Sequence, residues 1–166
     1  MQTKYFLLSE LKTFCEKVTE GRYYDVSTQK GDTAVEKRPP SIHRMRLPDS
    51  HSAKKYAPYI LLQYLNGITQ QKAGQRSFAT ATIRFIFCVY NENEEEGALD
   101  LLNLMETVAS ALLKEPFFST FFYLDREAGL EDLIYTDDTR PFYAGEMVGT
   151  FIIPEQERNV NEWLRS

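Results

Sequence analysis

The chain has 166 residues, which is enough for one domain with a buried core and few for two. Its hydrophobic fraction of 43% and charged fraction of 26% are ordinary for a globular protein, and the aromatic fraction of 13% favours sheet. No apolar run approaches the roughly 18 residues of a membrane-spanning helix, and residues 1–11 lack the features of a signal peptide. We therefore expect a cytoplasmic protein.

The first predicted element is a helix at residues 5–20, with Gly21 as a natural C-cap. Its apolar stripe consists of Phe6, Leu7, Leu11, Phe14, Cys15 and Val18. Residues 23–26 fit a short strand.

Residues 29–57 show no sustained periodicity and contain Gly31, Pro39-Pro40 and Pro48, so we predict a long loop. Loops of this length in compact domains are usually functional or disordered. Between residues 37 and 55 a single acid, Asp49, accompanies eight basic or titratable residues: Lys37, Arg38, His43, Arg44, Arg46, His51, Lys54 and Lys55. We expect both histidines to be exposed to solvent.

An antiparallel hairpin is predicted next. Residues 58–65 are strongly apolar and indicate a strand, and Asn66-Gly67 is a strong turn signal because both residues tolerate positive φ. The polar stretch 69–75 follows, so the tip of the hairpin carries Lys72 and Arg76.

The longest regular pattern runs from Phe78 to Pro116. Alternating residues up to Tyr90 predict a strand, and its dry face consists of Ala79, Ala81, Ile83, Phe85, Phe87 and Val89. Asn93 is placed as an N-cap with Glu96 three residues on, and Pro116 ends the helix that follows. The apolar stripe of this helix consists of Leu101, Leu102, Met105, Val108, Ala109 and Leu112, and we expect it to pack on the strand.

Residues 117–124 predict a turn that leads into a short strand ending near Asp125, and a second short strand is predicted at residues 130–135, paired with the first across a turn at 127–129. Residues 143–153 predict the last strand, and residues 155–166 a terminal arm whose Trp163 is a candidate to dock on a neighbour. The predicted fold is one α+β domain spanning residues 1–166. Its mainly antiparallel or mixed sheet packs against the N-terminal helix and the long central helix.

The two parts of the chain differ in charge. Residues 1–57 have a formal charge of +4 and residues 58–166 of −9, which together give the net charge of −5. Opposite signs within one domain suit head-to-tail packing between copies and internal ion pairs, and solvated faces of mixed sign explain them at least as well.

No metal-binding, acyl-transfer or phosphate-binding motif occurs, which disfavours an enzyme, and we expect neither metal nor cofactor. Cys15 lies in a helical pattern and Cys88 in the middle of a strand, so both are expected to be buried free thiols. The acidic run at residues 92–96 lies at a helix N-terminus, where the helix dipole favours carboxylates.

Three stretches together suggest a family. They are APYILLQYL at 57–65, TIRFIFCVYNENEEEG at 82–97 with the helix that follows, and RPFYAGEMVGTF at 140–151. In order and pattern they resemble the tail-completion or tail-terminator proteins of long-tailed phages and prophages, over roughly residues 1–154. The basic loop at 29–57 is longer than this family leads us to expect.

The resemblance implies a small α/β fold and a structural virion protein that assembles into a hexameric ring, stops growth of the tail tube and joins the tail to the head connector. It implies a location in the bacterial host cytoplasm during assembly and then in the virion tail. The implied partners are further copies of the chain, the tail-tube protein and head-tail connector proteins, with DNA at most passing through the ring and no membrane. The expected contact residues are Lys37, Arg38, Arg44, Arg46, Lys54, Lys55, Lys72, Arg76 and Trp163.

Other interpretations stay open on the sequence alone. The chain could be another head-tail joining or minor structural protein of a phage. It could be a nucleic-acid-binding domain that uses the basic loop at 37–55, although no aromatic residue is interleaved there before Tyr56 and the rest of the chain is acidic. A small-molecule enzyme with a site among the Tyr and Asp residues of the C-terminal half is the third alternative.

Overall fold

A computed structural model describes residues 3–27, 36–70, 73 and 78–154, together with all their side chains except those of residues 50–52. The predictions for Lys72, Arg76, Trp163, the arm at 155–166, the His51 side chain and residues 28–35 of the loop therefore fall outside what it describes.

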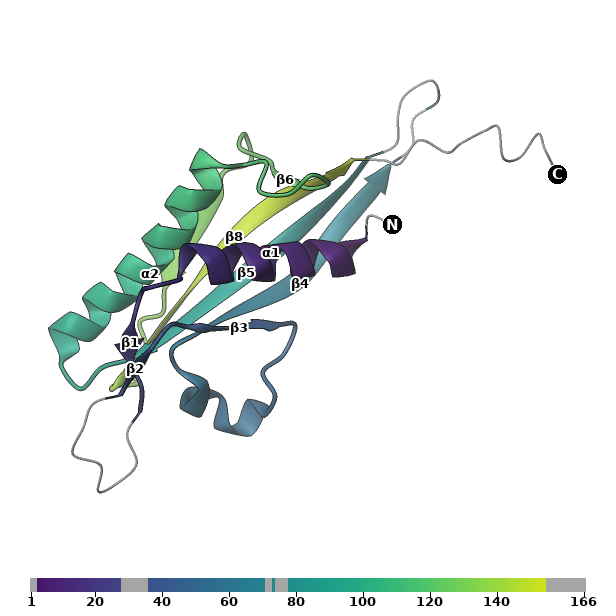
Figure 1. Cartoon of the computed structure of the whole chain (residues 1–166). Coiled ribbons are helices and arrows are strands. Elements are labelled where there is room, and N and C mark those ends of the chain that lie inside the picture. Colours follow the sequence, from purple (N-terminus) through teal and green to yellow (C-terminus); the bar gives the residue numbers. More distant parts are fainter. Residues whose placement is uncertain (1–2, 28–35, 71–72, 74–77, 155–166) are drawn as a thin grey trace.

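The fold is a single α+β domain, as predicted. Two helices, α1 (Lys4–Val18) and α2 (Glu94–Lys114), lie on the same face of a curled mixed sheet (Figure 1). The sheet has the order β3-β4-β5-β8, and both β6 and β7 pair with the outer edge of β8. Its strands are β3 (Ser41–Arg44), β4 (Tyr59–Gln70), β5 (Phe78–Tyr90), β6 (Tyr123–Leu124), β7 (Leu130–Ile134) and β8 (Phe142–Pro154). A separate antiparallel pair is formed by β1 (Tyr24–Asp25) and β2 (Lys37–Arg38).

The main core lies between the sheet and the helices. Alternate side chains of β5 are buried on this face, and the most completely buried ones are Ala81, Ile83, Phe85, Phe87 and Val89. Each large apolar side chain buried in this way stabilises the fold by roughly 1.5–3 kcal/mol. The predicted packing of this strand on the helix that follows is confirmed, because buried residues of both belong to one core cluster.

Helix α2 begins as predicted, since the Asn93 side chain accepts a hydrogen bond from the Glu96 backbone N–H at 3.1 Å. Leu102, which the sequence pattern places in the apolar stripe, is 41% exposed, whereas Leu104 is fully buried. At about 100° per residue, Leu102 falls outside the arc that faces the sheet, and Leu104 falls inside it.

Helix α1 also matches its prediction closely, and Thr3 provides its N-cap by accepting a hydrogen bond from the Phe6 N–H. Gly21 follows the helix with a φ of 77°, a conformation that suits glycine. Phe6 is an exception to the predicted stripe, because 47% of it is exposed while Leu8 is buried.

The predicted loop is wrong over much of its described part. Residues 36–57 contain β2, β3 and a 3-10 helix, η1 (Ser50–Tyr56). β3 pairs in parallel with β4, but only Ile42 of its four residues is buried, so the strand leaves no periodic pattern in the sequence. The η1 segment covers part of the sheet face opposite the helices, where a second, smaller core contains Ala57, Tyr59, Leu61, Cys88 and Tyr90.

The hairpin is confirmed, but its predicted turn is wrong. β4 continues through Asn66 and Gly67, which pair with Thr82 and Ala81 of β5, and a bulge between Tyr64 and Asn66 takes up an extra residue. Gly67 serves close packing instead of a turn, since a Cβ atom there would lie 2.4 Å from the Thr80 carbonyl oxygen.

The predicted pairing of β6 with β7 is also wrong, because both strands pair with β8. Leu130 lies opposite Gly149, and its side chain occupies the space that a Cβ atom at Gly149 would fill. The turn between the two strands is held by Asp125, whose side chain accepts hydrogen bonds from the N–H groups of Glu127 and Ala128.

Candidate assembly surfaces

Arg38 has a structural role. Its guanidinium donates to the backbone oxygens of Tyr56 at 2.6 Å, Pro58 at 3.0 Å and Pro39 at 3.1 Å, and so ties η1 to the start of β4. Three of the five guanidinium N–H groups therefore serve hydrogen bonds within the chain.

Most other described residues of the predicted basic set also have contacts within the chain. Lys37 lies 3.5 Å from Asp25, and Lys55 lies 3.5 Å from Asp49. Lys54 lies 5.5 Å from the centre of the Phe142 ring, which belongs to β8. These lysines belong to β2 and η1, whereas Arg44 ends β3 and Arg46 lies in the loop that follows it.

His43 is half-buried in β3 and is not the exposed loop residue that was predicted. Its ring packs edge-on against Tyr56 and Tyr59, with centroids 5.8 and 6.5 Å away, and its Nε2 lies 3.0 Å from the Ser41 hydroxyl. Burial lowers the pKa of His43, and the nearby positive charges of Arg38 and Lys12 lower it further.

Both cysteines are buried free thiols, as predicted. Burial raises the pKa of Cys15 to about 12 and that of Cys88 to about 11. Thiols with such values are almost entirely protonated at neutral pH, and the thiolate is the reactive form.

One side of the sheet carries positive charge and a free strand edge, which we call the basic edge. It comprises β3, the adjoining residues 45–48, residues 65–70 of β4 and Lys4 at the start of α1. Within the described chain, no strand pairs with the outer side of residues 65–70. Leu65 and Ile68 are 42% and 55% exposed there.

The charges of the basic edge are held by few contacts. Arg44 donates to the Ser9 hydroxyl at 2.7 Å and lies over the ring of Tyr5, while Lys4 lies over the ring of Tyr64. Arg46 is exposed in the loop that follows β3, and no acidic residue occurs in residues 41–48. The net charge of this edge is therefore positive.

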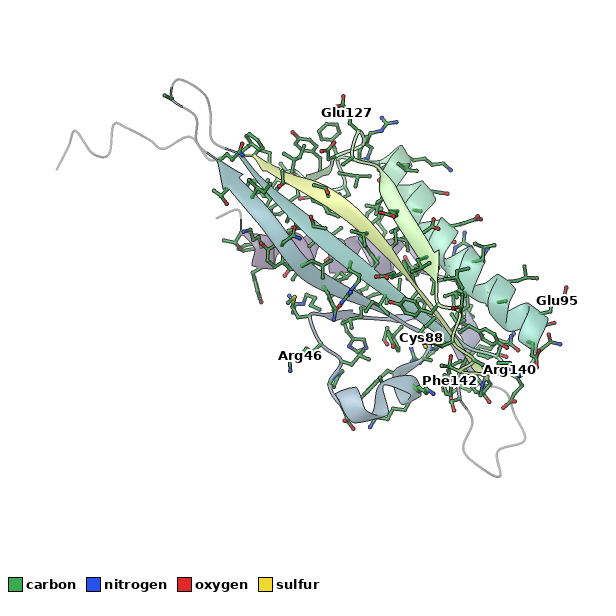
Figure 2. All side chains as sticks on the ribbon, turned by 180° about the vertical axis from the view of Figure 1, so that it is seen from behind. Arg46, Cys88, Glu95, Glu127, Arg140 and Phe142 are labelled. Atoms are coloured by element: carbon green, nitrogen blue, oxygen red, sulfur yellow. The ribbon has the colours of Figure 1, made fainter. Side chains whose placement is uncertain are left out.

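The opposite side of the sheet is negative, and we call it the acidic edge. It comprises β7 and residues 135–138, which carry four acids and no basic residue: Glu131, Asp132, Asp137 and Asp138. Leu133 and Ile134 are 55% and 43% exposed there. Among the described residues, no strand pairs with the outer side of β7. Figure 2 shows Arg46 on the β3 side of the sheet and Glu127, just before β7, on the other.

The positive charge of Arg140 partly neutralises the negative charge at one end of the acidic edge. Arg140 forms an ion pair with Asp138 at 2.8 Å and a second with Glu94 at the start of α2. Hydrogen bonds from the Arg140 side chain and backbone lower the pKa of Asp138, and the charge of Arg140 lowers it further. Asp137, one residue away, is exposed, and no ion pair to it appears in the described chain.

The carboxylates of the C-terminal half do not converge on a catalytic site. Glu92, Glu94, Asp138, Arg140 and Tyr143 line an open hollow, in which Arg140 pairs with Glu94 and Asp138. Glu92 accepts a hydrogen bond from the Tyr90 hydroxyl. In the part of the chain with described side chains, no three His, Cys, Asp or Glu residues lie close enough to hold a metal ion. Nor does any helix in that part have the length and apolar character to span a membrane.

Comparisons with known proteins add no family assignment. No family model matches the sequence, and no curated protein is significantly similar to it.

Proposed function

We propose that this chain is a structural protein of a phage or prophage tail, namely a tail terminator. It assembles into a hexameric ring that ends growth of the tail tube and joins the tube to the head connector. The proposal starts from the resemblance carried by residues 57–65, 82–97 and 140–151. In the fold, these stretches form β4, the β5–α2 unit and β8, the elements around which the main core is built.

The observation that carries the proposal is the presence of two unlike and oppositely charged edges on one sheet, neither of which is paired with another strand among the described residues. A ring requires a heterologous interface, in which two different surfaces of one subunit meet and the rotation closes. The basic and acidic edges are such a pair, because each has exposed apolar residues and their charges are of opposite sign.

A nucleic-acid-binding function has less support. Arg38, Lys37 and Lys55 make contacts within the chain, and Lys54 lies against Phe142. Phosphate contacts need several basic side chains that are available to an external partner, and the contacts within the chain reduce that number.

The effect of this chain on the growth of tail tubes tests the proposed function. The tail-tube protein of the same genome is polymerised with and without this chain, and tube lengths are measured in negative-stain images. We expect shorter tubes with a ring at one end, and fewer copies of the chain should suffice than there are tube subunits. Tubes of unchanged length without rings would contradict a terminator function. Rings that bind connector proteins but leave tube length unchanged would favour another head-tail joining role.

A further inference from the structure

We propose that copies of this chain associate head to tail by continuing the sheet, so that β7 of one copy pairs antiparallel with residues 65–70 of β4 in the next. This interface specifies how the subunits of the proposed ring contact one another. The pairing of strands stands by itself, and only the closure of the row of subunits into a ring rests on the proposed function.

Strand direction permits this pairing. β4, β5, β8 and β7 are successive antiparallel neighbours, so β7 runs antiparallel to β4 within one subunit. A second copy in the same orientation therefore presents its β7 antiparallel to the free edge of β4. Unpaired backbone N–H and C=O groups on such edges readily bond to another strand. β4 has no charged residue along its length, so no charged side chain of this strand hinders pairing with another strand.

The exposed apolar residues lie on the same face of the sheet. Ile68 is opposite Thr80 of β5, and Leu133 is opposite Glu146 of β8, both on the face away from the helices. Each is 55% exposed in the single subunit. In a continued sheet the two side chains become cross-strand neighbours and lose contact with water.

The same register brings opposite charges together. With Ile68 opposite Leu133, antiparallel pairing places Asp137 beside residue 64, or beside residue 63 if the extra residue of the bulge is skipped. Gln63 donates a hydrogen bond at 3.2 Å to the backbone oxygen of Met45, the residue before Arg46. Asp137 of one copy therefore approaches Arg46 of the next, and this pairing of charges fixes the register of the interface.

Cysteine cross-linking tests the contact directly. Ile68→Cys and Leu133→Cys proteins are mixed under mild oxidation, while the native cysteines remain buried. We expect a disulfide-linked dimer containing one copy of each variant, and a ladder from the protein that carries both changes. Leu102→Cys, on the exposed side of α2, is the matched control in place of Leu133→Cys. Cross-linking no stronger than in this control, including the case of a protein that stays monomeric, would overturn the interface.

A charge exchange tests the register. Arg46→Glu and Asp137→Arg should each weaken self-association about tenfold, measured by sedimentation. The two changes combined in one chain should restore most of it. Arg22→Glu, an equal change of charge beyond the end of α1, should leave association unaffected. A combined variant as weak as the single ones would overturn the proposed register.

The outcomes for the interface and for the function are distinguishable. Cross-linked dimers or open rows without rings would support the interface and contradict the ring. Rings that form without the Ile68–Leu133 cross-link would overturn the interface and leave the terminator function standing.

Discussion

His43 shows how a residue predicted to be exposed becomes a pH-sensitive part of the fold. It packs between Tyr56 and Tyr59 near two cations, and these surroundings disfavour its charged form. Its folded-state pKa is thus below the value of about 6.5 that it has when unfolded. Its contribution to stability is complete above about pH 6.5 and is lost as the pH falls toward the lowered folded-state pKa.

We therefore predict that the melting temperature falls between about pH 7.5 and pH 5.5, and that His43→Gln reduces this fall. Thermal unfolding followed by circular dichroism at several pH values measures the effect. His51 is present in both proteins, so its own titration cancels in the comparison. An equal fall in the two proteins would show that His43 does not titrate in this range.

At the scale of elements, the start of α2 depends on contact between Gly97 and Tyr143 of β8. A Cβ atom at Gly97 would lie 2.3 Å from Cε2 of the Tyr143 ring, far inside contact distance. Alanine is favoured over glycine in a helix by about 1 kcal/mol, but overpacking costs roughly 1–3 kcal/mol. The steric cost is the larger of the two.

We predict that Gly97→Ala lowers the free energy of unfolding by up to about 2 kcal/mol, as measured by urea denaturation. The control is the same change in a Tyr143→Ala background, where the ring is absent and the alanine should be neutral or stabilising. A Gly97→Ala protein at least as stable as the parent would contradict the close approach seen in the structure.

The elements that could be predicted are those with long periodic patterns. β5 buries alternate residues from Ala81 to Phe87, and α2 buries one stripe along its twenty-one residues, so their sequences carry the signal. β3 and the true partner of β7 could not be predicted, because a short strand is determined by which neighbour it meets. Gly67 was misleading, since a glycine needed for close packing looks the same in a sequence as one needed for a turn.

At the scale of the whole molecule, the charge asymmetry was visible in the sequence but the surfaces were not. Charge counts indicated a basic first part and an acidic second part. Only the fold shows that Arg46 and Asp137 lie on opposite edges of one sheet and that Arg38 is used internally. Leu133 also gave no signal, because an apolar residue in a strand pattern suggests a core position and not an exposed edge.

The mass of the protein in solution is the most direct test of ring assembly. Light scattering coupled to size exclusion, over a range of concentrations and with negative-stain images of the largest peak, gives both mass and shape. We predict a species of six times the 19.3 kDa chain mass that appears as a closed ring. A mass of 19.3 kDa at every concentration, with no rings in the images, would contradict assembly through the two edges.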